Sequence, residues 1–166
     1  ESLLKMGRKV RPGIPEEAGD LMAAIGQIVR QRIPVLGICL GHQALARAFG
    51  AELRQLSAPL HGHPTMLTVT DAGDLLLQKV APPLIVGRYH SWVVDPDSMP
   101  EELIASSHDE TGHIMSFYHR NLPIHGVQFH PESCISNCGS ALIRNWLATC
   151  CRHPLRERSL RKFPDL

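Results

Sequence analysis

The stretch Gly-Ile-Cys-Leu-Gly-His-Gln at residues 37–43 decides the fold, because it follows the apolar run Ile33–Leu36 and has the composition of a sharp strand-to-helix turn. Gly37 and Gly41 permit a tight bend and close approach of the backbone. Such an elbow lifts the side chain of Cys39 above the sheet edge, beside free backbone N–H groups. The helix N-terminus also predicts a lowered pKa for the thiol. We interpret Cys39 as a nucleophile; the alternative is a small buried residue at a strand end.

A second strand-like segment, Ile124–Phe129, leads into the residues that a cysteine nucleophile needs. His130 can accept the thiol proton, and Glu132 can hold the imidazole in one tautomer. Pro131 ends the strand between them. A lone His-x-Glu is more often a solvated pair, but beside the elbow it predicts a triad with Cys39 at the carboxyl ends of strands.

Together the two motifs resemble the signature pair of class I glutamine amidotransferases, the second reading Gly-Val-Gln-Phe-His-Pro-Glu-Ser at residues 126–133. Arg-Tyr-His-Ser at residues 88–91 and Leu-His-Gly at residues 60–62 resemble the glutaminase subunits, component II, of anthranilate synthase and aminodeoxychorismate synthase. The resemblance runs from about Pro12 to about Leu147 and so covers most of the chain.

The resemblance implies hydrolysis of glutamine to glutamate through a cysteine thioester, with Cys39 as nucleophile, His130 as general base and acid, and Glu132 as its orienter. It also implies that ammonia passes to a chorismate-binding synthase subunit, component I, of the folate or the tryptophan pathway. No cofactor or metal is implied. The residues that match glutamine-binding positions are Arg11, Pro12, Gly13, Leu40, Gln43, Ser91 and Trp92. Arg11 stands where the family has glycine, so its side chain either fills the pocket or turns to solvent.

The start of the chain departs from the family pattern, which has a strand, a helix and a second strand before the segment around Gly13. We therefore expect an N-terminally truncated domain over residues 1–150, with exposed apolar faces, followed by a tail over residues 151–166. Two alternatives to an active glutaminase follow. One is a catalytically inactive fragment that retains the triad and acts at most as a binding module. The other is a thiol hydrolase of the same fold with another substrate.

The order of elements predicts an α/β fold with an open, mostly parallel sheet, flanked by helices and carrying a small antiparallel excursion. With the resemblance, this is the flavodoxin-like architecture of class I glutamine amidotransferases. Helical spacing predicts helices over about residues 15–30, 41–49 and 137–149. Strands are expected over about residues 33–38, 51–56, 66–70, 84–86, 103–106, 114–118 and 124–129.

Composition is that of an ordinary globular protein: of 166 residues, 43% are hydrophobic and 20% charged. The net charge of +1 gives no reason to expect nucleic acid, and no apolar run is long enough for a membrane span, so the chain is expected in the cytoplasm. Five cysteines without paired Cys-x-x-Cys spacing argue against a disulfide framework. A metal site from Cys134, Cys138 and His130 is a weaker hypothesis than incidental cysteines on one helix face. The histidines outside the motifs, including His119 and His125, are expected on the surface.

Overall fold

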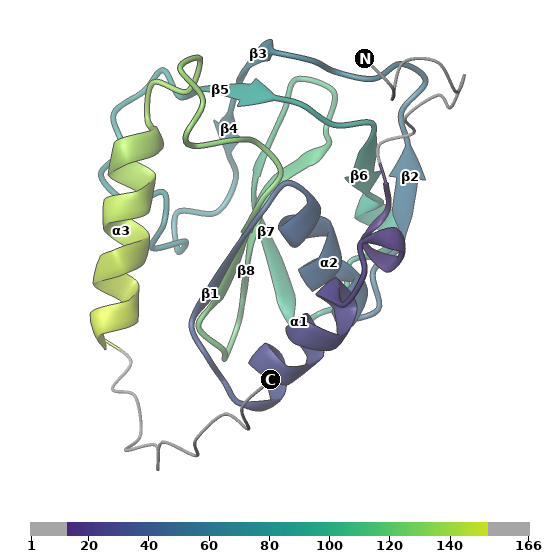
Figure 1. Cartoon of the computed structure of the whole chain (residues 1–166). Helices are drawn as coiled ribbons and strands as arrows, with labels where there is room; N and C mark the ends of the chain where they lie inside the picture. The colour runs from purple at the N-terminus through teal and green to yellow at the C-terminus, as the bar shows by residue number, and fades with distance from the viewer. Residues whose placement is uncertain (1–12, 153–166) are drawn as a thin grey trace, which may run out of the picture.

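The computed structural model describes residues 13–152, and a five-stranded sheet forms the centre of this part of the chain (Figure 1). Its strand order is β1 (Val35–Ile38), β9 (Ile124–Val127), β8 (Ile114–His119), β7 (Leu103–His108) and β4 (Thr68–Val69). Two smaller sheets pair β2 (Leu53–Gln55) with β6 (Trp92–Val94), and β3 (His63–Met66) with β5 (Ile85–Arg88).

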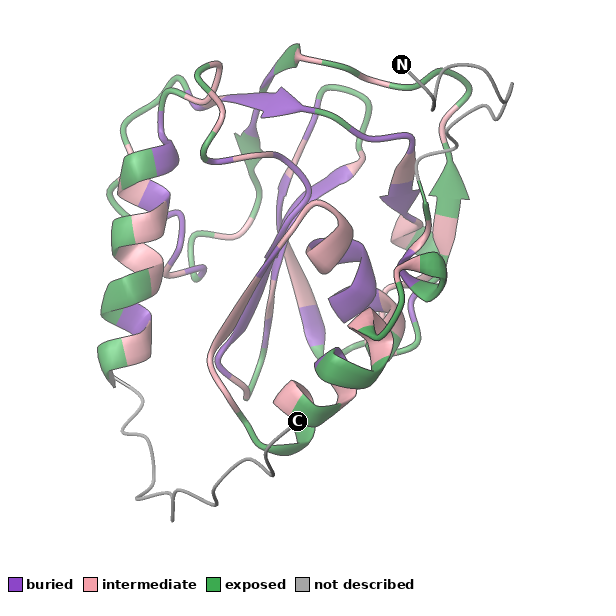
Figure 2. Cartoon of the chain, viewed as in Figure 1, coloured by how far each residue is buried: buried purple, intermediate pink, exposed green. Residues whose placement is uncertain are grey.

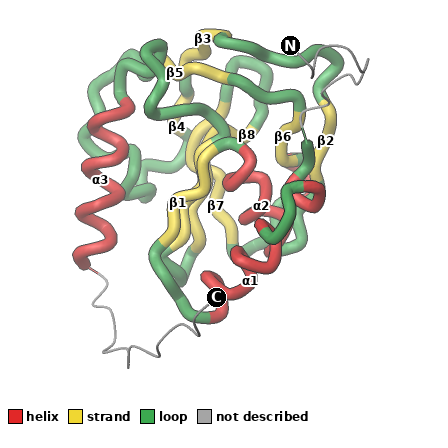
Figure 3. Tube along the Cα trace, in the orientation of Figure 1, coloured by secondary structure: helices red, strands yellow, loops and turns green. Residues whose placement is uncertain are grey.

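Helices cover both faces of the central sheet. The helices α1 (Leu21–Arg30) and α2 (Leu40–Ala48) lie on one face, and α3 (Gly139–Arg152) lies on the other (Figure 1). Two single-turn helices, η2 (Pro15–Glu17) and η3 (Pro96–Ser98), complete the set. Long loops run between the small strands at the end of the sheet where β1 meets α2 (Figure 3).

Each face of the sheet has its own apolar core, which is why the central strands β8 and β9 are almost entirely buried, whereas the outer helix faces are exposed (Figure 2). The core under α1 and α2 includes Ile25, Leu45, Phe117 and Ile124. The core under α3 includes Met115, Val127, Phe129 and Leu142. Strands buried on both sides by helices confirm the predicted open α/β sheet flanked by helices.

The balance of strand directions differs from the expectation of a mostly parallel sheet. The strands β1 and β9 pair in parallel, with Val35 opposite Ile124. The pairs β9–β8, β8–β7 and β7–β4 are antiparallel. Short turns join β7 to β8 and β8 to β9, and such connections reach only antiparallel neighbours. In residues 13–152 the antiparallel part is therefore larger than the small excursion expected.

Three local elements also differ from the sequence prediction. The helix expected over residues 15–30 is divided, because Gly19 has a φ of +57° between η2 and α1. The strand expected over residues 66–70 is divided at Leu67, and its halves β3 and β4 join different sheets. The strand β6 is an addition, which pairs with the edge strand β2.

Within the described part of the chain, β1 pairs with a neighbouring strand on one side only. Beside it lies an apolar groove of about 620 Å³, bounded by Ile38, Pro131 and the α3 residues Ile143 and Leu147. The groove is open on the side where Leu147 lies, since this residue is 52% exposed. This edge of the sheet thus presents apolar side chains and unpaired backbone groups to solvent.

Candidate active site

Cys39 occupies the turn between β1 and α2 in a strained backbone conformation, with φ of 51° and ψ of −102°. Such angles are uncommon for a residue other than glycine and persist only where the surroundings enforce them. Here the N–H of Cys39 donates to the carbonyl of Val127 at 2.8 Å, and the N–H of Gln43 donates to the carbonyl of Cys39 at 3.1 Å. The end of β9 and the first turn of α2 therefore hold the nucleophile elbow that the glycine spacing predicts.

A cavity of about 170 Å³ opens beside the thiol. Most of the predicted glutamine-binding positions line it together with Cys39, namely Gly13, Leu40, Gln43, Ser91 and Trp92, and Tyr89 and His90 complete its wall. Arg11 and Pro12 lie outside the described residues. Within the described part of the chain the Ser91 hydroxyl is buried without a hydrogen-bond partner, which leaves a polar group for a bound molecule.

The thiol itself is held in its neutral form. Burial raises the pKa of Cys39; a hydrogen bond from the backbone of Leu40 opposes this, and the negative charge of Glu132 adds to it. The prediction of a lowered thiol pKa is wrong, because desolvation outweighs the helix N-terminus. The Sγ atom lies 3.9 Å from the carbonyl oxygen of Tyr89 and 3.7 Å from Nε2 of Gln128. A base is needed to make the thiolate.

His130 and Glu132 form a hydrogen-bonded pair just beyond β9, with 2.6 Å between Nδ1 and Oε1. Burial acts to raise the pKa of Glu132, but the hydrogen bond from His130, a backbone hydrogen bond and the charge of His130 together lower the pKa below its usual value. The backbone of His130 is fixed as well, because its N–H donates to the carbonyl of Gly87 at 3.0 Å and its carbonyl accepts from Ser136 Oγ at 2.6 Å. With Nδ1–H directed at the carboxylate, Nε2 is the nitrogen that can accept a proton.

Tyr89 connects the thiol and the His130–Glu132 pair. Its carbonyl faces Cys39, while its ring packs edge-on against the His130 ring at 5.3 Å between centroids. The tyrosine lines both the cavity beside Cys39 and a second cavity of about 510 Å³ that includes His130, Glu132, Ser133 and Cys134. No hydrogen bond joins Cys39 Sγ to His130 among the contacts of residues 13–152. The structure thus brings the predicted triad to one sheet edge, in two adjoining cavities.

Several residues of the site were not singled out from the sequence. Gln128 is fully buried, and its Oε1 accepts from Gln43 Nε2 at 3.0 Å. The signal for it was a polar side chain inside a buried strand motif.

His119 and His125 are also buried, 8% and 6% exposed, so their expected surface placement is wrong. The ring of His119 packs against Phe49 at 4.8 Å between centroids, and Nδ1 of His125 lies 3.2 Å from Asp74 Oδ1.

Asp109, at the turn between β7 and β8, is a further buried acid and forms an ion pair with Arg88 at 2.6 Å. Burial acts to raise the pKa of Asp109, but hydrogen bonds from His113 and Thr111 and the charge of Arg88 lower it to about 2. A carboxyl whose folded pKa lies below its unfolded value stabilises the fold above the unfolded pKa, and this stability is lost as the pH falls.

We expect this carboxylate to contribute about 2 kcal/mol at neutral pH, lost between about pH 4 and pH 2. The measurement is urea unfolding of the natural protein and of Asp109→Asn at pH 7, 5, 3 and 2. The free-energy difference between the two proteins should shrink by this amount over the acid range. A difference that stays constant down to pH 2 would contradict the assignment.

No group of three His, Cys, Asp or Glu side chains in residues 13–152 is placed to hold a metal ion. No helix in that range has the length and apolarity to cross a bilayer. Cys134 and Cys138 both precede α3, so they do not share a helix face as expected. Cys134 is exposed, whereas Cys138 is buried, and neither is in a disulfide.

Comparison with known proteins places these features in a family. The model of the glutamine amidotransferase class-I family matches residues 11–150. Anthranilate synthase component 2 of Mycobacterium tuberculosis is 41% identical over 140 residues, which is 84% of this chain and 59% of that protein. Aminodeoxychorismate synthase component 2 of Escherichia coli is 42% identical over 136 residues, which is 82% of this chain and 71% of that protein.

A solved structure from Thermoplasma acidophilum, assigned to a GMP synthase, superposes with a TM-score of 0.74 at 25% identity. The match covers 83% of this chain and 68% of that one. The chain thus spans little more than half of the M. tuberculosis relative and about two thirds of the others. The elbow, the cavity beside it and the matched sequence agree, and the chain belongs to the class I glutamine amidotransferase family.

Proposed function

We propose that this chain hydrolyses glutamine to glutamate and delivers the ammonia to a chorismate-binding synthase subunit. The observation that carries this proposal is the cavity beside Cys39, which gathers the nucleophile with five positions that match glutamine-binding ones. The relatives named above are component 2 subunits of anthranilate and aminodeoxychorismate synthases, which supports the tryptophan and folate pathways equally.

In this mechanism the side-chain amide of glutamine lies against Cys39 Sγ. The neutral thiol gives its proton to Nε2 of His130, and the thiolate attacks the amide carbon. The N–H groups of Leu40 and Gly13, two residues that line the cavity, stabilise the oxyanion. The imidazolium then protonates the leaving nitrogen, ammonia departs, and water hydrolyses the glutamyl thioester. Tyr89 contacts both the thiol, through its carbonyl, and the imidazole, through its ring, and so lies beside the proposed path of the proton.

The docking surface for the synthase subunit is proposed where two loops meet beside this site. Tyr89 is 39% exposed, and its ring lies within 3.6 Å of the place a side chain would take at Gly62. The neighbouring His61 and His63 are exposed, and Met66 is 63% exposed. Tyr89, which lines the catalytic cavity, and Met66, at the end of strand β3, are residue types enriched in protein interfaces.

The test is glutamate release by the protein alone and with a chorismate-binding synthase subunit, together with labelling by a glutamine-mimicking diazo-ketone and intact mass. A single adduct that glutamine blocks would support the proposal. No adduct and no glutamate release, even with the synthase subunit, would favour the inactive binding module instead.

Substitution of Glu132 by glutamine tests the proposed orienter. The amide keeps the shape but loses the charge that accepts from His130 Nδ1, so both tautomers become accessible. We expect glutaminase kcat to fall by about 100-fold with little change in the unfolding midpoint, because the Glu132 side chain is 64% exposed. Glu101→Gln, at another exposed glutamate, is the matched control and should retain full activity. Equal kcat in both variants would remove Glu132 from the mechanism.

A further inference from the structure

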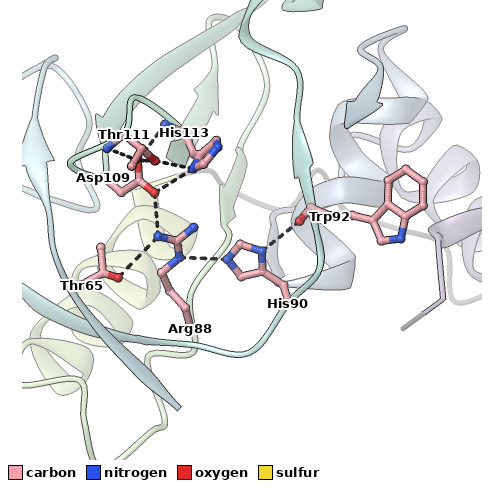
Figure 4. A network of polar contacts seen from close by, with 7 residues as sticks. All are labelled: Thr65, Arg88, His90, Trp92, Asp109, Thr111 and His113. Carbon is pink, nitrogen blue, oxygen red and sulfur yellow. Dashed lines mark hydrogen bonds and ion pairs between the residues drawn. The ribbon is translucent and has the colours of Figure 1, made fainter. Parts of the chain in front are cut away.

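Arg88, the last residue of β5, is a buried arginine to which the proposed mechanism gives no role. It is 3% exposed, and its guanidinium lies at the centre of a row of polar groups (Figure 4). Its Nη1 donates to Asp109 Oδ2 at 2.6 Å, and its Nε donates to Nε2 of His90 at 3.0 Å. The third nitrogen, Nη2, is buried without a partner in the described part of the chain. Burial of a guanidinium charge is costly in free energy, which suggests that the position of Arg88 between its two partners serves a role.

On one side, Asp109 is held rigidly by the turn between β7 and β8. Its Oδ1 accepts from the N–H of Thr111 at 2.9 Å and from the N–H of His113 at 2.8 Å, and its Oδ2 lies 2.9 Å from His113 Nδ1 (Figure 4). The turn after β7 therefore fixes the carboxylate independently of Arg88. The ion pair with Arg88 connects this fixed carboxylate to the small sheet that contains β5.

On the other side, Arg88 fixes the proton of His90. Because Nε–H of the arginine donates to Nε2, the neutral imidazole carries its own proton on Nδ1. That proton is directed at the carbonyl of Trp92, 3.0 Å away (Figure 4). Burial lowers the pKa of His90 to about 4, and the charge of Arg88 adds to this, so the ring stays neutral near pH 7.

The carbonyl of Trp92 joins this row to the thiol. It also accepts from Gln43 Nε2 at 2.8 Å, and the same amide donates to Gln128 Oε1 at 3.0 Å. Gln128 Nε2 in turn lies 3.7 Å from Cys39 Sγ. The groups along this path, His90, Trp92 and Gln43, all line the cavity beside the nucleophile.

We propose that Arg88, anchored by Asp109, is a positioning residue that sets the His90 tautomer and thereby fixes segment 89–92 and Gln43 for capture of glutamine. The proposal rests on the function proposed above, and it assigns the recognition geometry to a buried pair outside the cavity. Arg88 directly precedes this segment, so a shift of its side chain is passed to residues 89–92 without an intervening flexible link. Two further backbone hydrogen bonds hold segment 89–92 in place. The N–H of Leu60 donates to the His90 carbonyl at 2.9 Å, and the N–H of Leu56 donates to the Ser91 carbonyl at 2.8 Å.

The experiment uses full-length protein with Cys39→Ser, which prevents turnover, and two NMR readouts on the same samples. The nitrogen-15 shifts of the His90 ring at pH 7 report its tautomer without any need for activity. Titration with L-glutamine gives the dissociation constant. In the reference protein we expect the Nδ1–H tautomer and saturable binding of glutamine.

The informative variants interrupt the row at different bonds while the protein stays folded. In His90→Asn the side-chain amide reaches the place of Nδ1, so this variant keeps the bond to the Trp92 carbonyl and loses the bond from Arg88. In His90→Gln the amide reaches the place of Nε2, so this variant keeps the bond from Arg88 and loses the bond to Trp92. Arg88→Lys keeps the positive charge beside Asp109, but its single ammonium group lacks the planar guanidinium that donates to both Asp109 and His90. We expect each variant to weaken glutamine binding by about tenfold, and Arg88→Lys to mix the His90 tautomers. Arg47→Lys, at the half-exposed pair with Glu16, is the matched control and should bind as the reference does.

The outcomes separate the two proposals. An unchanged dissociation constant in both His90→Asn and Arg88→Lys would overturn the positioning role, as would an unchanged tautomer in Arg88→Lys. If the reference protein does not bind glutamine either alone or with the chorismate-binding synthase subunit, the proposed function fails, and the tautomer readout alone decides whether Arg88 sets His90.

Discussion

Replacement of Cys39 by alanine is expected to lower the proposed glutaminase turnover by roughly 10,000-fold or more, because it removes the atom that we propose attacks the amide. The fold should persist, since alanine is smaller than cysteine and the backbone bonds to Val127 and Gln43 do not involve the side chain. The measurement is glutamate release under saturating glutamine, with the diazo-ketone adduct followed by intact mass. The adduct should disappear together with turnover.

Cys134→Ser is the matched control for this experiment. Cys134 is exposed and lines the adjoining cavity with His130, so it is the thiol most accessible to adventitious labelling at this end of the sheet. Its replacement should leave both the adduct and turnover in place. If turnover instead survives in Cys39→Ala and is lost in Cys134→Ser, then Cys134 is the nucleophile and the assignment of Cys39 is wrong.

Replacement of Gly37 by alanine is expected to destabilise the protein by about 3 kcal/mol or more. The added Cβ would lie 2.5 Å from the carbonyl oxygen of Gly41 and 2.6 Å from Leu45 Cδ1. The first of these is backbone of α2, so it can give way only if the helix moves away from β1. Because Cys39 lies at the same junction, glutamine-blocked labelling should fall as well. Urea unfolding followed by circular dichroism measures the loss of stability.

Gly26→Ala supplies the comparison on a neighbouring helix. There the added Cβ meets only the flexible end of Arg30 at 3.4 Å, and alanine favours a helix over glycine by about 1 kcal/mol. This variant should unfold at the same or a slightly higher urea concentration than the natural protein. Equal midpoints for the two alanine variants would show that the contact between β1 and α2 is not as close as described.

Much of the site could be predicted from sequence because its decisive features are local. The glycines on both sides of Cys39 indicate a tight turn from the local sequence alone, and Pro131 separates two polar residues at a strand end. The thiol pKa could not be predicted in the same way. It depends on how far Cys39 is buried and on the charge of Glu132, which only the folded chain brings near.

The same distinction explains the missed polar row. Arg88 and Asp109 are 21 residues apart, one in β5 and the other in the turn after β7 of the central sheet, so no periodicity links them. The sequence identified the motif around Arg88 by resemblance, without a reason for the arginine. Pairing directions were also misjudged, because they follow from turn lengths between β7, β8 and β9 that apolar patterns do not reveal.

The parallel pairing of β1 with β9 also sets the order in which this site is assembled during folding. Cys39 and Gln128 are 89 residues apart in sequence, whereas Leu103 and His119 meet across a local hairpin. Contacts between distant segments form more slowly, because a long loop must close before any contact stabilises it. The hairpin that holds Asp109 needs only a short loop closure, whereas the elbow meets β9 only after a long one. We therefore expect competence to bind substrate to arise only after β1 pairs with β9, so that a chain stalled before this pairing would contain every residue of the proposed site without the site itself.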